Sequence, residues 1–175
     1  MMSAQSGKGK AYDIAFTGIM LALALALSFL ESMLPVLPFL PVGVKLGLSN
    51  IVTMYCLFFS GVKQSLSVCF LKSAFVMLLR GPTGGALSLA GGLLSVAVMA
   101  LLKRVLRLSN GLLSIFGAVS HNIGQLVLAS VILKSVYTFY YLPLMVISGA
   151  IMGAATGVLL KLVMPYLQHV DKTAK

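Results

Sequence analysis

Formal charges are few in this 175-residue chain, and almost all of them lie between long apolar stretches. The chain has thirteen basic and three acidic residues, and 59% of its residues are hydrophobic. Its mean hydropathy is +1.06, whereas about a quarter of the residues in a soluble domain are charged. An ionisable group is costly in hydrocarbon and is usually kept for function. We therefore predict an all-α membrane protein whose functional residues are the few polar groups inside the apolar stretches.

Six apolar stretches can be distinguished. They cover approximately residues 14–30, 46–59, 64–79, 83–102, 112–133 and 142–164. A helix needs roughly 17–25 residues to cross the bilayer core, so the second and third stretches are short. We predict six transmembrane helices in a single integral membrane domain over residues 1–175.

The basic residues between these stretches predict the orientation. If the gaps are assigned alternately to the two sides, one side receives Lys8, Lys10, Lys63, Lys103, Arg104, Arg107, Lys161, Lys172 and Lys175, and the other receives Lys45, Arg80 and Lys134. Cytoplasmic loops are enriched in Lys and Arg, so both termini are predicted to be cytoplasmic. The net charge of +10 is dispersed in this topological pattern, which argues against nucleic acid as a partner.

Small residues recur every four positions in two of the stretches. They are Gly18, Ala22 and Ala26 in the first, and Gly149, Gly153 and Gly157 in the sixth. A spacing of four places each set on one helix face, where another helix can approach closely. We interpret the glycines of the sixth stretch as packing within the bundle. The first set fits either internal packing or contact with another protein.

The first outer loop is rich in proline and glycine, with Pro35, Pro38 and Pro41 followed by Gly43 and Lys45. Proline cannot continue a helix. The loop therefore forms an apolar cap, which serves either as a lid over an outward-facing cavity or as an interfacial anchor.

The polar residues on the outer half of the predicted bundle are candidates for a binding pocket. They are Glu31, Lys45, Asn50, Lys72, Arg80, His121, Asn122 and Gln125. His121, Asn122 and Gln125 share one helical stripe by spacing. Lys72 lies in mid-span, where a cation needs a partner, water or a ligand.

Each candidate also has a structural interpretation. Lys45 and Arg80 can extend to the interface as long basic side chains do, and the residues of the His121 stripe can tie helices together. Lys72 and Glu31 can form a structural pair. The excess of cations over carboxylates otherwise favours an anionic or phenolic ligand.

Catalytic and metal-binding patterns are missing from the sequence. There is no phosphate-binding Gly-x-x-x-x-Gly-Lys-Ser/Thr loop, and the two aspartates, Asp13 and Asp171, lie at opposite ends of the chain. Cys56 and Cys69 lack metal-ligand spacing and are interpreted as small buried residues. We predict that the chain is not an enzyme and binds neither a metal nor a cofactor.

Three segments and the first small-residue ladder resemble a known family. The segments are Val44-Lys-Leu-Gly-Leu-Ser-Asn-Ile-Val52, Ser88-Leu-Ala-Gly-Gly-Leu-Leu-Ser95 and Ala118-Val-Ser-His-Asn-Ile-Gly-Gln125. Over about residues 12–165 the chain is similar to the S components of energy-coupling factor (ECF) transporters. Within that group it resembles the Gx transporter family, also labelled heptaprenyl diphosphate synthase component I.

The resemblance implies a substrate-binding subunit in a prokaryotic plasma membrane. Such subunits capture a vitamin-like molecule under a gate formed by the first loop. The ligand expected here is a quinone or isoprenoid precursor, a flavin or another vitamin-like molecule. They act with a transmembrane coupling protein and two cytoplasmic ATPases. Ala22 and Ala26 would then face the coupling protein, and residues 35–45 would form the gate.

Two other functions are kept as alternatives. The family's second label implies a membrane accessory subunit of a prenyl diphosphate synthase, which would be non-catalytic because the aspartate-rich sites are absent. A stand-alone secondary transporter would instead use Lys72, Glu31 and His121 to couple protons.

Overall fold

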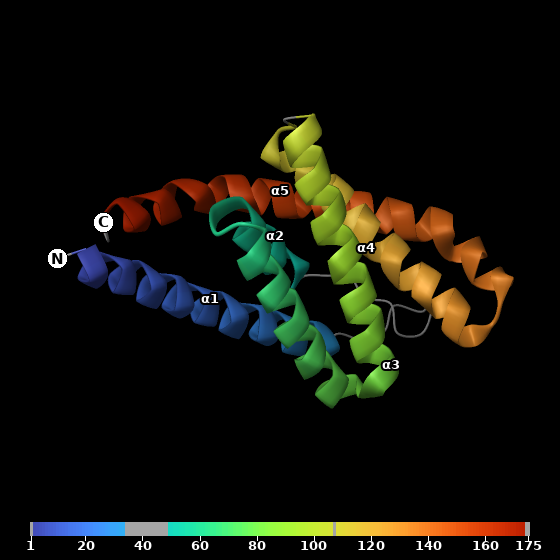
Figure 1. Ribbon diagram of the computed structural model, residues 1–175. Coiled ribbons are helices and arrows are strands. Elements are labelled where there is room, and N and C mark those ends of the chain that lie inside the picture. Colours follow the sequence, from blue (N-terminus) through green and yellow to red (C-terminus); the bar gives the residue numbers. More distant parts are fainter. Residues whose placement is uncertain (1, 34–48, 107, 174–175) are drawn as a thin grey trace.

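The computed structural model is a bundle of helices (Figure 1). It describes the backbone of residues 2–33, 49–106 and 108–173, and the side chains of these residues other than 2–13, 31, 159–160 and 162–173. The helices are α1 (Met2–Met33), α2 (Asn50–Phe59), α3 (Val62–Val105), α4 (Asn110–Leu133) and α5 (Leu142–Thr173), with a 3₁₀ helix, η1 (Val136–Tyr141), before α5. Over these ranges no strand is present, which confirms the all-α class.

Three helical stretches are long and apolar enough to cross a membrane. They are Val62–Val105, Asn110–Leu133 and Val136–Val158, while Ile14–Leu30 and Asn50–Phe59 are apolar but shorter. These lengths and compositions are those of a membrane protein. The first of the three contains two of the predicted spans, 64–79 and 83–102. The number of crossings and their orientation remain predictions.

The two predicted spans within α3 are separated by a sharp reversal at Gly81. Gly81 has φ +79° and ψ 176°, a conformation that is costly for residues with a Cβ. Pro82 then occupies the start of the second arm, where its missing N–H costs no helical hydrogen bond. Figure 1 shows the two arms of α3 running to and from this reversal at the lower end of the molecule. The Gly-Pro pair thus makes α3 a helical hairpin.

The two arms of α3 pack directly against each other. Ser73 Oγ donates a hydrogen bond to Ser88 Oγ over 3.3 Å. A Cβ added at Gly85 would lie 2.5 Å from Met77 Cβ, and one added at Gly92 would collide with the Cys69 thiol. Small residues on the second arm therefore allow the close contact.

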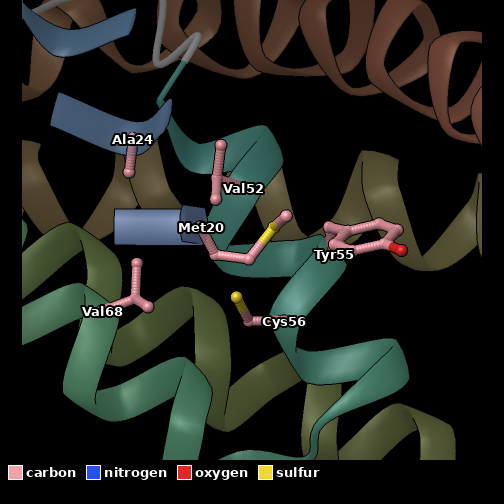
Figure 2. Close-up of a cluster of buried hydrophobic side chains, with 6 residues drawn as sticks. All are labelled: Met20, Ala24, Val52, Tyr55, Cys56 and Val68. Atoms are coloured by element: carbon pink, nitrogen blue, oxygen red, sulfur yellow. The ribbon is translucent and has the colours of Figure 1, made fainter. Parts of the chain in front are cut away.

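A hydrophobic core joins α1, α2 and the first arm of α3. Met20 and Ala24 of α1 meet Val52, Tyr55 and Cys56 of α2 and Val68 of α3 (Figure 2). On α1 the buried residues Met20, Ala24 and Ser28 recur every four positions, which places them on one helix face. Cys56 and Cys69 are free and buried, as predicted.

Glycines form the contact between α4 and α5. A Cβ added at Gly149 would lie 3.0 Å from Val119 Cα, one at Gly153 2.5 Å from Ile115 Cα, and one at Gly157 3.0 Å from Gly111 Cα. Helix backbones approach this closely only where side chains are missing. The interpretation of these glycines as internal packing is confirmed.

Candidate functional site

The candidate site is a group of buried polar side chains around the second arm of α3. Ser88, Gly91 and Ser95 follow each other at intervals of three and four residues, so they share one face of this arm. Their contacts come from three parts of the bundle: Ser88 is contacted by Ser73 of the first arm, Gly91 by α4, and Ser95 by α2 and α4. Small side chains on α3 leave room for the polar groups of its neighbours.

Asn50, at the start of α2, is connected to α4 through α3. Its Nδ2 donates to Ser95 Oγ over 3.4 Å, and Ser95 Oγ donates to the carbonyl oxygen of Gly117 over 2.8 Å. Asn50 and Ser95 are both buried. Asn50 Oδ1 is buried without a hydrogen-bond partner among the described residues.

His121 and Gln125 lie one helical turn apart on α4, beside Gly91. Gln125 Nε2 and His121 Nε2 are 3.0 Å apart. A Cβ added at Gly91 would lie 2.7 Å from the His121 carbonyl oxygen and 2.9 Å from Gln125 Cγ. Both side chains are buried, and Gln125 Oε1 has no hydrogen-bond partner in the described part of the chain.

Lys72 brings a cation to the same region. Its side chain is only 1% exposed, and it lies on the first arm of α3 next to Ser73, which bonds the second arm. It is close enough to His121 and Cys69 for its charge to act on both. A buried ammonium group is costly in an apolar bundle, and Lys72 has an interaction within the described part of the molecule.

Of the eight predicted binding residues, Asn50, His121 and Gln125 lie at neighbouring turns of the second arm of α3, and Lys72 is buried on the first arm. Asn122 turns to α5 instead, where its Nδ2 donates to the carbonyl oxygen of Met145 over 2.9 Å and to Ser148 Oγ over 3.3 Å. The predicted stripe on α4 is thus divided between two neighbours: His121 and Gln125 lie against α3, and Asn122 bonds α5.

Of the other three predicted binding residues, only Arg80 has a described side chain. Arg80 is half-buried beside the Gly81 reversal, and it has an interaction within the molecule. The side chain of Glu31, all of Lys45 and the predicted gate at residues 35–45 lie outside the described residues.

Sequence reasoning missed the serine residues of the site. Ser73, Ser88 and Ser95 are buried, and their hydroxyls join the two arms of α3 and join α3 to α4. Hydroxyl residues are common in apolar helices, so single ones give no signal. The three- and four-residue spacing of Ser88, Gly91 and Ser95 would have been the signal to follow.

The small-residue ladder of α1 faces away from the core. Gly18, Ala22 and Ala26 are exposed, and a Cβ added at Gly18 would meet nothing within 4 Å. They are offset by two residues from the buried set of Met20 and Ala24, which places them on nearly the opposite helix face.

No group of three His, Cys, Asp or Glu side chains that could hold a metal ion occurs among the described residues. The polar groups that meet around α3 are amides, hydroxyls, an imidazole and an ammonium group. They can bind and orient a polar molecule by hydrogen bonds and charge.

The three segments singled out in the sequence therefore meet in space: Asn50 comes from the first, Ser88–Ser95 is the second, and His121 and Gln125 come from the third. The family described as heptaprenyl diphosphate synthase component I matches residues 20–163. The chain belongs to this family. No curated protein and no solved structure matches the chain. The match to the heptaprenyl diphosphate synthase component I family spans all the described site residues and most of the bundle.

Proposed function

We propose that this chain is the substrate-binding S component of an ECF-type importer, which captures a vitamin-like small molecule from outside the cell. The observation that carries the proposal is the burial of Lys72, Asn50, His121 and Gln125, the last three of which lie at neighbouring turns of the second arm of α3. Polar groups buried in a protein normally find hydrogen-bond partners. Two amide oxygens here have none among the described residues, which favours a site for a ligand over a purely structural network.

The chemistry of the described site favours binding over catalysis. Nucleophilic or acid–base catalysis needs a nucleophile held by a base, or paired titratable groups. Around α3 the hydroxyls of Ser73, Ser88 and Ser95 bond to each other's helices or to backbone, so they serve as links between helices. We propose that the chain is not itself an enzyme.

The proposed assembly places the chain in a prokaryotic plasma membrane, with six spans and cytoplasmic termini. A transmembrane coupling protein would pack on the exposed face of α1 formed by Gly18, Ala22 and Ala26, and two cytoplasmic ATPases would complete the importer. Small residues allow close approach of a second helix. The open space at Gly18 supports the use of this face by a partner.

A second candidate function is supported by the family description. The words "component I" of a heptaprenyl diphosphate synthase imply a further subunit, and the chain would then be a membrane accessory subunit of that enzyme. The bundle would supply membrane attachment, while the partner would supply the aspartate-rich catalytic site.

Affinity purification of the tagged chain from its native membranes separates the two functions. The importer proposal predicts that a polytopic membrane protein and two ATPases accompany the chain. It also predicts that Ala22→Leu, which adds bulk to the exposed face of α1, removes them without lowering the melting temperature of the chain. Val127→Leu, an exposed change on α4, is the matched control and should retain the partners. Recovery of a soluble prenyl synthase subunit in place of the ATPases would overturn the importer proposal in favour of the second candidate.

A further inference from the structure

The turn between α4 and α5 is closed by hydrogen bonds and packs on the bundle. Lys134 ends α4 in the left-handed conformation, with φ +48°, and its N–H and that of Ser135 donate to carbonyl oxygens of the last turn of α4. Thr138 is the buried residue of η1, and its Oγ1 donates to the Ser135 carbonyl oxygen over 3.0 Å. η1 contacts both α4 and α5. The fold therefore determines which side of η1 faces outward.

The side chains of η1 are arranged along three edges, because a 3₁₀ helix has three residues per turn. Thr138 lies on the edge that packs on the bundle. Tyr137 and Tyr140 form a second edge, here called the tyrosine edge; they are 75% and 80% exposed, and their rings stack with centroids 6.0 Å apart. Val136 and Phe139 form a third, apolar edge and are also exposed. η1 thus presents an apolar edge and a hydroxyl-bearing edge on its outer surface.

The exposed apolar surface of the bundle continues to η1 from both neighbouring helices. The stretches Asn110–Leu133 and Val136–Val158 are each apolar and long enough to cross a membrane. The exposed apolar side chains next to η1 are Val131, Ile132 and Leu133 of α4 and Leu144 and Ile147 of α5. The apolar edge of η1 extends this surface, which in a membrane faces the hydrocarbon.

The polar groups of the turn begin where this apolar surface ends. Lys134 is exposed, and it is the only Lys, Arg, Asp or Glu between Arg107 and Lys161. Figure 1 shows the turn in orange at the right, at the opposite end of the molecule from the start of α1 and the end of α5. A turn between two membrane-length helices, with one lysine and exposed tyrosines, has the composition of a membrane–water interface.

We infer that η1 lies flat in the surface of the lipid bilayer, with its apolar edge toward the hydrocarbon and its tyrosine edge toward the phospholipid head groups. A tyrosine ring has an apolar body and a hydroxyl that can bond at the wet side of the interface. Amphipathic helices that lie in the interface bury their apolar side in the same way, and Lys134 can extend to the lipid phosphates. The inference goes beyond the proposed function and holds for either candidate, because it concerns how the turn fixes the depth of α4 and α5 in the bilayer.

Single tryptophans on the two exposed edges test this orientation, since the chain has no tryptophan of its own. The reporters are Tyr137→Trp and Tyr140→Trp on the tyrosine edge, and Val136→Trp and Phe139→Trp on the apolar edge. All four side chains are exposed, so the substitutions leave the core unchanged. Each full-length variant is reconstituted into phosphatidylcholine vesicles. Its depth is measured by the quenching of its fluorescence by lipids brominated at successive acyl-chain positions, and its exposure to water by iodide quenching.

We expect the two tryptophans of the tyrosine edge to lie at the same depth. If η1 stood upright in the membrane, they would differ by about 6 Å, because a 3₁₀ helix rises about 2.0 Å per residue. Phe139→Trp and Tyr140→Trp form a matched pair, since they are adjacent in the sequence but lie on different edges. The tryptophan at Phe139 should lie deeper than the one at Tyr140, and Val136→Trp should repeat this result from the same edge.

Four results would overturn the inference. A depth difference of about 6 Å between Tyr137→Trp and Tyr140→Trp would show that η1 stands upright. Equal depths on the two edges, or a deeper tyrosine edge, would contradict its orientation. Strong iodide quenching without quenching by brominated lipids would place η1 in water. Protection of all four tryptophans from both quenchers would show that a second copy of the chain covers η1.

Discussion

Gly153→Ala should weaken the packing of α5 on α4. The new Cβ would lie 2.5 Å from Ile115 Cα and 2.9 Å from Ser114 O, whereas ordinary Cβ contacts begin at 3.4 Å. Both neighbouring atoms belong to the backbone of α4, so no side chain can turn aside. The helices must separate locally by about 0.9 Å, which would also loosen the contacts at Gly149 and Gly157.

Overpacking of this kind costs about 1–3 kcal/mol. For a chain of this size, that corresponds to a fall in melting temperature of roughly 2–12 °C. Thermal unfolding of the purified protein in detergent, followed by circular dichroism, measures it. Gly18→Ala is the matched control, because nothing lies within 4 Å of its new Cβ and alanine is the better helix former. A Gly153→Ala variant as stable as wild type, or equal destabilisation by both changes, would refute the packing argument.

Three further predictions concern the reversal at Gly81, the contact between α4 and α5, and the membrane interface. Gly81→Ala should lower the stability by about 1–3 kcal/mol, because Gly81 has φ +79° and ψ 176°, a conformation that is essentially restricted to glycine; unchanged thermal unfolding would show that the hairpin does not need this conformation. Asn122→Leu should lower the free energy of unfolding by about 0.6–1.7 kcal/mol through loss of the hydrogen bonds to α5. An unaltered melting temperature would show that these bonds do not stabilise the bundle. The chain contains no tryptophan, so a single introduced tryptophan reports its own depth in the membrane. Tyr140 on η1 is 80% exposed, and the fluorescence of Tyr140→Trp in vesicles should be quenched most strongly by lipids brominated near the head group. The fluorescence of Val127→Trp, on the exposed side of α4 and nearer the middle of the predicted span 112–133, should be quenched most by lipids brominated near the chain ends, and the reverse depth order would contradict the topology.

Much of the bundle was predictable because the lengths of the apolar stretches and the positions of glycine and proline determine locally where helices run and where they break. The break between the predicted spans at 64–79 and 83–102 falls at Gly81 and Pro82, where the backbone does reverse. The start of α1 was not predictable from hydropathy. Its apolar stretch begins at Ile14, but the helix begins at Met2, since a helix can continue through polar residues such as Lys8 and Lys10.

The site was predictable only in part, because helical spacing identifies a stripe and not the neighbour that each residue meets. His121 and Asn122 are adjacent, yet one lies beside Gly91 of α3 and the other bonds the Met145 backbone of α5. That choice depends on which helix packs on each side of α4, and the packing depends on glycines distributed over three helices. Lys72 could be singled out in advance because a mid-span cation is costly wherever its neighbours lie.

Native mass spectrometry of the gently purified chain tests the central claim, that the polar group around Lys72 holds a small molecule. We expect a bound molecule on the wild-type protein. We also expect Lys72→Met to lose that molecule while the melting temperature shows that the bundle remains folded. A wild-type protein without any bound molecule would contradict the proposed binding function. So would a Lys72→Met variant that keeps its ligand and changes only in stability, because Lys72 would then be a structural group.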